Sequence, residues 1–426
     1  MRAAGRTLAL GLVLAVLSVS CGGEPGQPEA SQTALASEAQ AGPLPASLVQ
    51  VAENVAELRV LPAPGEVKFG LVPRADVPAL IERLLTDEDR AQFAQTTTLY
   101  RLLGHFRPDE DYLSVYRQLS AASVAGLYSP PRKTLWLVQP GDGTPDFVAL
   151  PRAAKSTLAH ELVHATQDAA FNLEALSGHG DLDATLALTC LVEGDAVVHQ
   201  SLYKARYLTS PQSGTPAALP ASFTADIPPS LSREFFFPYA TCAEWVRSIR
   251  DSGGTAAVDA LFREPPRSTA IVLHPERGPT WRAETTSLPD LAGALGGGWK
   301  RESGGTFGEF QVRNYLQLRL PGLRAATAAT GWSGDRYDVY SRENESVAVF
   351  RLLFEDEAQA AEFRLAQDEL LSAPGAKGSA GGGMIVASRA DSNTTARLTT
   401  PGREVIFAIG SNAASARRAA GLLGGG

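Results

Sequence analysis

The segment His160-Glu161-Leu162-Val163-His164 forms the pattern H-E-x-x-H. On an α-helix, residues four apart lie about one turn from each other on the same face. The imidazoles of His160 and His164 can therefore bind one metal ion, and Glu161 lies beside them. Six histidines in 426 residues would form this pattern by chance only roughly 0.005 times. The segment predicts a metal-binding helix in which Glu161 accepts a proton from water.

A third metal ligand has to come from outside this helix, because a catalytic zinc ion takes three protein ligands and keeps a position for water. Glu193 lies in Leu191-Val192-Glu193-Gly194-Asp195-Ala196, 29 residues after His164. This distance leaves room for a loop and a second helix that returns past the metal. Glu193 shares one helical face with Leu186, Cys190 and Val197, and a lone carboxylate on an apolar face is costly unless it is paired or bound to metal. The pattern favours Glu193 as the third zinc ligand.

Four other residues are alternatives for a role near the metal. Cys190 lies on the same predicted face as Glu193, and a thiolate can bind zinc. His179 lies in a glycine-containing loop, where a histidine is more often exposed. Asp168 lies too far along its helix to join the same ion. Asp168 or Asp195 could instead hydrogen-bond a ligand imidazole, and a surface or capping role for each carboxylate stays open.

Stabilising the transition state of such a reaction also needs a hydrogen-bond donor for the oxyanion that develops. Tyr239 in Phe237-Pro238-Tyr239 and His274 in Leu273-His274-Pro275-Glu276 are the candidates. Tyr128 is a third candidate. For each of them, a packed aromatic ring or a structural histidine is the competing interpretation.

The N-terminus has the pattern of an export signal. Arg2 and Arg6 precede an uncharged apolar run from Leu8 to Val19, which is shorter than the ~20 residues that span a bilayer. Ser18-Val19-Ser20-Cys21 resembles a lipobox, so we expect cleavage before Cys21 and lipidation of that cysteine. The serines also suit an ordinary signal peptidase, which would release a secreted protein, and an uncleaved anchor is the remaining alternative.

Cysteine usage agrees with lipidation. The chain has three cysteines, and an odd thiol is unusual in an oxidising compartment. Lipidation of Cys21 leaves Cys190 and Cys242, which either form a disulfide or remain two buried thiols.

The chain divides into five predicted segments. They are a signal peptide (1–20), a flexible tether rich in Gly, Pro, Ala and Ser (21–47), a catalytic domain (48–290), a glycine-rich linker (291–308) and an accessory domain (309–426). The accessory segment has no His and no Cys, so we expect no metal site there.

Apolar spacing predicts an α+β fold for both domains. In the catalytic segment we expect helices over 48–62, 77–103, 151–170, about 181–207 and 235–250, and strands over 67–72, 124–128, 134–138 and 146–150. In the accessory segment we expect helices over 307–318, 322–330 and 357–371, a hairpin over 337–354, two further strands and a closing helix.

The charge of the chain excludes one class of partner. The formal net charge is −8 and the sequence pI is about 5.4, whereas binding to nucleic acid needs a basic face. We therefore expect no nucleic acid partner.

Several segments together resemble a family of exported bacterial and archaeal zincin-like proteins, whose metal helix reads close to H-E-L-T-H-A-L-Q-D-Q. Here the corresponding helix continues after His164 as Ala165-Thr166-Gln167-Asp168-Ala169. The other family-like stretches are Val124-Ala125-Gly126-Leu127-Tyr128, Leu191 to Ala196, Phe237-Pro238-Tyr239, residues 265–275 and residues 331–337.

The resemblance covers most of the chain from about residue 50. It implies a gluzincin-type site with His160, His164 and Glu193 on zinc and Glu161 as general base. Val163, Thr166 and Ala169 depart from the family pattern but leave the ligands and the base in place.

Taken together, these patterns predict a zincin-like zinc metalloprotease outside the cytoplasm, tethered to a membrane through lipidated Cys21 and acting on a protein or peptide substrate. A substrate strand is expected to add to an edge of the small sheet before the metal helix. A non-catalytic, zinc-stabilised binding lipoprotein is one alternative, although such a protein has no need of Glu161. A zinc hydrolase that acts on non-peptide substrates is the other.

Overall fold

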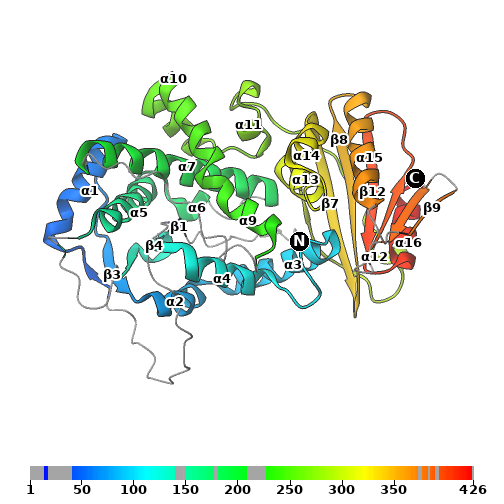
Figure 1. Ribbon diagram of the computed structural model, residues 1–426, viewed down its shortest axis with the longest axis horizontal. Coiled ribbons are helices and arrows are strands. Elements are labelled where there is room, and N and C mark those ends of the chain that lie inside the picture. Colours follow the sequence, from blue (N-terminus) through cyan, green and yellow to red (C-terminus); the bar gives the residue numbers. More distant parts are fainter. Residues whose placement is uncertain are drawn as a thin grey trace, which may run out of the picture.

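The computed structural model describes residues 14–17, 41–139, 147, 150–176, 181–208, 227–372, 377–381, 384–388 and 393–424. These residues form two separate β-sheets and many helices, which confirms the α+β class. The molecule is elongated, with one sheet in each of two lobes (Figure 1). No helix in the described part of the chain is both long enough and apolar enough to cross a bilayer.

The N-terminal lobe contains a five-stranded sheet. Its strands are Leu14–Leu17 (β1), Gly42–Pro43 (β2), Lys68–Val72 (β3), Val124–Ser129 (β4) and Thr134–Val138 (β5), in the order β1-β4-β5-β3-β2. β4 and β5 form the predicted antiparallel hairpin, whose turn is the short 3-10 helix Pro130–Arg132. β3 runs parallel to β5, and β1 pairs antiparallel with the outer edge of β4.

Helices make up the rest of this lobe. They are Ala46–Arg59 (α1), Val77–Leu84 (α2), Asp87–Leu103 (α3), Tyr112–Ser123 (α4), Arg152–Phe171 (α5), Leu173–Leu176 (α6), Leu182–Tyr207 (α7), Pro229–Phe236 (α9), Thr241–Arg263 (α10) and Ala270–Leu273 (α11). Three 3-10 helices join them, at Arg74–Asp76 (η1), Phe237–Tyr239 (η3) and Pro275–Arg277 (η4).

α5 is the central helix of the lobe. It begins directly after Pro151, where the missing N–H of proline costs nothing. Residues 157–168 of α5 are all buried, and Leu158 and Leu162 share one core with Leu135 and Leu137 of β5. A helix that is buried on every side also buries its polar residues, so the predicted metal helix carries its histidines into the interior.

α7 crosses α5 and also packs against α10. Asp181 caps α7, because its carboxylate accepts a hydrogen bond from the N–H of Ala184 at 3.2 Å. Asp183, two residues further on, accepts hydrogen bonds from the backbone N–H (2.9 Å) and the hydroxyl (2.5 Å) of Thr269. The predicted second long helix is thus present, and it lies directly beside the first.

A disulfide joins α7 to α10. Cys190 and Cys242 are bonded, with their Cα atoms 5.0 Å apart. The two helices approach closely here, since a Cβ on Gly194 would lie 2.7 Å from the carbonyl oxygen of Cys242. Of the two alternatives left open by the sequence, the structure has the disulfide, which removes Cys190 from the potential metal ligands.

The C-terminal lobe, residues 291–424, is built on a seven-stranded antiparallel sheet. The strands are Lys300–Gly305 (β6), Trp332–Arg342 (β7), Glu345–Phe354 (β8), Lys377–Gly381 (β9), Met384–Ser388 (β10), Thr394–Leu398 (β11) and Glu404–Gly410 (β12), in the order β6-β7-β8-β12-β11-β10-β9. The helices are Ala292–Leu295 (α12), Glu309–Leu316 (α13), Gly322–Ala329 (α14), Glu357–Leu371 (α15) and Ala413–Gly424 (α16). The predicted order of helices and hairpin in this lobe is confirmed.

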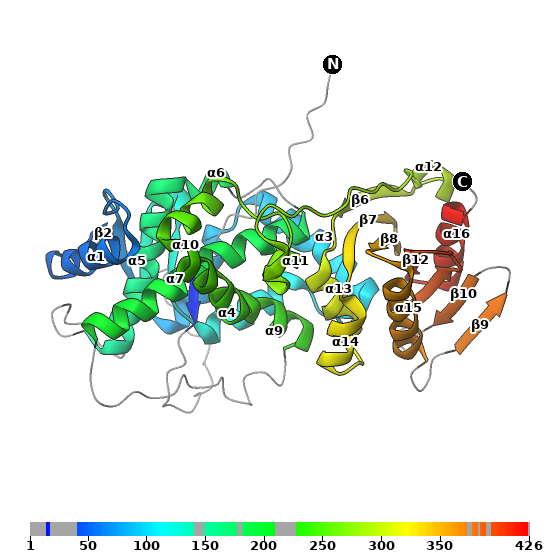
Figure 2. The ribbon, with the colours of Figure 1, turned by 90° about the horizontal axis from the view of Figure 1, so that it is seen from above.

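The two lobes share one hydrophobic core. Tyr100 and Leu231 of the N-terminal lobe belong to the same buried cluster as Tyr315 and Phe350 of the C-terminal lobe. α3 lies beside the sheet of the C-terminal lobe at β8 (Figure 2). Since the cluster is continuous, the lobes pack as one body and not as two domains on a flexible hinge.

The predicted linker over 291–308 is wrong. α12 packs against α16, with Leu295 in a core cluster that includes Leu423, and β6 pairs with β7. The glycines serve close packing in this segment: a Cβ on Gly304 would lie 2.0 Å from a carboxylate oxygen of Asp338. The glycine-rich segment 291–308 is therefore a packed part of the C-terminal lobe and not a linker.

Two predicted helices differ from the observed ones. The segment 77–103 is broken after α2, because Thr86 and Asp89 form a capping box that starts α3. The segment 235–250 divides between α9, η3 and α10, since Pro238 lacks the N–H needed to continue a helix. The predicted strand over 146–150 lies mostly outside the described residues.

Replacing both Cys190 and Cys242 with serine should destabilise the N-terminal lobe without releasing metal. The disulfide joins residues 52 apart in sequence, and the loss of such a bridge typically costs about 2–5 kcal/mol. Chemical unfolding of the double variant, with zinc content measured on the folded sample, checks this expectation. Cys21→Ser leaves the pair intact and is the matched control. Zinc loss in a folded Cys190→Ser variant would contradict the structural role of this cysteine.

Candidate metal centre

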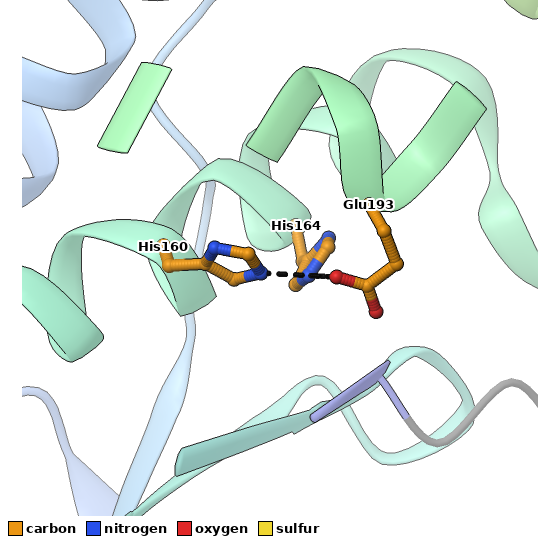
Figure 3. Close-up of side chains that lie close together, drawn as sticks. All are labelled: His160, His164 and Glu193. Atoms are coloured by element: carbon orange, nitrogen blue, oxygen red, sulfur yellow. Dashed lines mark hydrogen bonds and ion pairs between the residues drawn. The ribbon is translucent and has the colours of Figure 1, made fainter. Parts of the chain in front are cut away.

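Three buried side chains from two helices converge at the crossing of α5 and α7 (Figure 3). Nε2 of His160 lies 3.1 Å from Oε2 of Glu193, and Nε2 of His164 lies 3.6 Å from the same oxygen. The ligand atoms of all three residues lie within 4.8 Å of one another. The structure therefore brings together His160, His164 and Glu193, the three ligands that the sequence predicts, here called the metal group.

The geometry of this group suits a zinc ion. Tetrahedral zinc with ligand bonds of about 2.0–2.2 Å places its ligand atoms about 3.3 Å from each other. The separations of 3.1 and 3.6 Å lie on either side of that value. Two imidazoles and one carboxylate also leave one tetrahedral position for water or substrate, as in catalytic zinc sites.

The protonation states at the group also suit a cation. Burial lowers the pKa of the His160 imidazole and so favours its neutral form. Burial alone would raise the pKa of Glu193, but His164 and His160 beside it lower that pKa to about 2. A neutral imidazole and an ionised carboxylate are the forms that bind metal ions.

Gln167 fixes the orientation of His164. Its Nε2 donates to the carbonyl of Val192 at 3.0 Å and to Oδ2 of Asp195 at 2.8 Å, which uses both amide hydrogens. The amide oxygen is thus left to accept from Nδ1–H of His164 at 2.9 Å. With its proton on Nδ1, His164 presents the lone pair of Nε2 to the metal.

Asp195, a hydrogen-bond partner of Gln167, belongs to a buried network of charged side chains. Asp195 accepts from Nε of Arg59 at 2.7 Å and lies 3.0 Å from Nδ1 of His199. Arg59 also pairs with Asp259 at 2.7 Å. This network joins α1, α7 and α10 behind the metal group, so Asp195 acts on His164 through Gln167.

Glu161 follows His160 on α5 and lies against β4 of the small sheet. A Cβ added to Gly126 of β4 would come within 3.0 Å of Oε1 and 3.1 Å of Cγ of Glu161. Only a glycine allows the strand to pass so close to this carboxylate. The predicted base is therefore buried on the metal-binding helix, next to the backbone of β4.

The three oxyanion candidates have different surroundings. The ring of Tyr239 lies 6.5 Å from that of His160, and burial together with the nearby Glu193 raises the pKa of its phenol well above the ordinary value. The hydroxyl of Tyr128 donates to Asp168 at 2.7 Å. His274 lies 2.8 Å from Glu309 and 3.2 Å from Arg313, at the junction of the lobes. Tyr239 is the one that the structure places beside the metal group.

The remaining predicted residues have other positions. Asp168 binds Lys133 at 2.7 Å and the N–H of Leu173 at 3.1 Å, so it anchors the end of α5 and does not contact a ligand imidazole. His179 lies outside the described residues, as does Cys21.

An apolar pocket of about 160 Å³ opens beside the metal group and was not predicted. Glu193 and Tyr239 line it, together with residues of α3, α4, α7 and α9 and Gln311 of α13. No linear motif marks the pocket, because its walls come from segments that are far apart in the sequence. The role of Gln167 could have been predicted from the sequence, because this residue follows His164 by about one helical turn. The role of Arg59 could not, because Arg59 lies 136 residues from its partner Asp195.

The comparison with known protein families finds a match in the C-terminal lobe. A family described as "Domain of unknown function (DUF8575)" matches residues 298–420. No curated protein and no solved structure matches the chain. The metal group lies outside the matched range.

Replacing Gln167 with leucine should weaken zinc binding about 10–100-fold, the usual effect of removing a partner of a ligand histidine. His164 then loses the acceptor that holds its proton on Nδ1. Competition with a chromophoric chelator measures the affinity. Glu193→Ala marks the larger loss expected from removing a ligand, and Gln50→Leu, which changes an exposed amide on α1, is the control. Unchanged affinity in Gln167→Leu would show that Gln167 does not orient the histidine.

Proposed function

We propose that the protein is a zinc metallopeptidase of the zincin type. The observation that carries this proposal is the position of Glu161, a fully buried carboxylate that follows His160 on α5 and lies against the glycine of β4. A purely structural metal site has no need of a carboxylate in this position.

Each residue of the site has a defined task in this proposal. Bound zinc would supply a Lewis acid that polarises a carbonyl and makes water more acidic. Glu161 accepts the proton of the attacking water and later passes it to the leaving amine. Tyr239 stays protonated at neutral pH because burial and Glu193 oppose its ionisation, so its hydroxyl can donate to the developing oxyanion.

The edge of β4 supports a peptide as substrate. The backbone of Leu14–Leu17 pairs antiparallel with this edge, with Val16 opposite Gly126. A strand in this position packs against α5, the helix that carries Glu161, and such pairing gives affinity through main-chain hydrogen bonds. Leu14–Leu17 belongs to the expected signal peptide, so its removal would leave the edge open to a substrate strand.

Two alternatives remain as competing hypotheses. A binding lipoprotein that keeps zinc for stability would have the same ligands but would not depend on Glu161. A hydrolase of non-peptide substrates would use Glu161 but not the edge of β4. The β4 edge beside the base favours the peptidase over both.

We further propose that the protein acts outside the cytoplasm, with a lipid on Cys21 as its membrane anchor. The charged start, the apolar run and the lipobox-like residues 18–21 support this location. The Cys190–Cys242 disulfide is consistent with an oxidising compartment.

Glu161→Gln should lower peptide hydrolysis by roughly 10²–10⁴-fold, because the amide cannot accept the proton. Zinc content and thermal stability should stay close to those of the wild type, since the change is nearly isosteric. Digestion of a peptide library, analysed by mass spectrometry, measures the loss. Glu53→Gln, an exposed carboxylate on α1, is the matched control. Full activity in Glu161→Gln would exclude the proposed mechanism, and activity only on non-peptide esters would favour the second alternative.

The intact mass of the protein from its native envelope should correspond to a chain that begins at a diacylglyceryl-modified Cys21. Cys21→Ala should abolish the modification and release the protein from the membrane fraction after cleavage by an ordinary peptidase, or leave it uncleaved. An unmodified wild-type chain that starts at or after Cys21 would refute the anchor.

A further inference from the structure

The pocket beside the metal group is lined by Glu193 of that group and by a further carboxylate, Glu234. A series of aromatic rings marks its course from Tyr239 to Phe235 (6.5 Å), Tyr116 (6.2 Å), Phe93 (5.6 Å) and Tyr112 (5.1 Å), where each distance joins neighbouring ring centres. An apolar cavity of about 150 Å³ can bind benzene, so a pocket of about 160 Å³ can admit one large side chain.

Glu234 of α9 contacts the last ring of this series. Its Oε1 accepts from the hydroxyl of Tyr112 at 3.1 Å, and its Oε2 accepts from Nε2 of Gln311 at 2.9 Å and from the hydroxyl of Tyr100. All three donors are neutral. A carboxylate offers about four acceptor positions, so Oε1 can accept a further hydrogen bond from the pocket.

The pocket has negative charge and no balancing cation. Among the described residues that line it, none is a lysine, an arginine or a histidine. Asp89, a second carboxylate on the wall, caps α3: its Oδ2 accepts from the N–H and the hydroxyl of Thr86, each at 2.8 Å. Glu234 is therefore the carboxylate available to a ligand. Burial raises its pKa, and a cation bound beside it would favour its ionised form.

An arginine or lysine side chain has the chemistry that complements this pocket. Its methylene groups would lie against the aromatic walls, and its charged end would reach Glu234. The rings would also attract the cation through their faces. An acidic side chain would face both Glu234 and Glu193 and would be rejected by like charge.

We propose that this pocket is a specificity pocket, in which Glu234 selects a lysine or arginine side chain next to the bond that is cleaved. The proposal rests on the proposed peptidase function and adds the class of substrate. Glu234 acts by binding the substrate side chain and takes no part in the proton transfer at Glu161.

The first test is the digestion of a peptide library by the zinc-loaded full chain. Lysine and arginine should be enriched at one position beside the cleaved bond. Glu234→Gln should lower kcat/KM for peptides with lysine or arginine about thirtyfold or more relative to matched peptides with methionine. Glu309→Gln is the matched control, because Glu309 is a buried carboxylate on α13 that does not line the pocket. Cleavage without enrichment, or an unchanged ratio in a folded Glu234→Gln, would overturn the specificity and leave the peptidase function standing.

The second test needs neither hydrolysis nor a variant. Benzamidine, a planar cation with an aromatic ring, should bind the zinc-loaded protein at least about tenfold more tightly than neutral benzamide, as measured by calorimetry. Equal binding of the two compounds, or no binding of benzamidine, would overturn the cation pocket even if Glu234→Gln failed to fold. If the wild type cleaves no peptide but prefers benzamidine, the peptidase function fails while the assignment of the pocket as a cation site holds.

Discussion

The crossing of α5 and α7 is the constraint on which the rest of the N-terminal lobe depends. α5 carries His160, Glu161 and His164 into a fully buried position, and buried polar groups are costly unless they are paired or bound to metal. Glu193 of α7 lies opposite the histidines and gives them a charged partner. The disulfide and the close approach at Gly194 then hold α7 against α10. The packing that stabilises the lobe is therefore the same packing that forms the metal group.

Residues other than the three ligands also fix the arrangement of the metal group. Gln167 hydrogen-bonds both Asp195 and His164, and Arg59 of α1 pairs with Asp195. Breaking a buried ion pair of this kind typically costs about 3–5 kcal/mol, so each member has to be present for the others to be tolerated. Such a network limits the movement of the imidazole, and a catalytic zinc site requires well-oriented ligands.

The sequence was sufficient for local features and insufficient for contacts between distant segments. It predicted the metal helix, Glu193 and the β4–β5 hairpin, because their signals are spacing and turn residues within short stretches. It could not reveal the pairing of Arg59 with Asp195, since nothing in the order of residues links positions 136 apart. The linker over 291–308 was wrong for a related reason: glycine that permits tight packing and glycine that permits flexibility look the same in one sequence.

The C-terminal lobe takes part in the pocket and is more than an appended domain. Gln311 of α13 lines the pocket and hydrogen-bonds both Glu234 and the hydroxyl of Tyr100. Tyr100 in turn belongs to the core cluster that runs into the second sheet. Any shift of α13 would thus move a partner of Glu234 and alter the pocket. The proposed arrangement of a strand edge, a base and a metal group could serve any peptide, whereas the surroundings of Glu234 are set where the two lobes meet. The proposed choice of substrate therefore depends on the packing between the lobes, and the proposed chemistry depends on the crossing of α5 and α7.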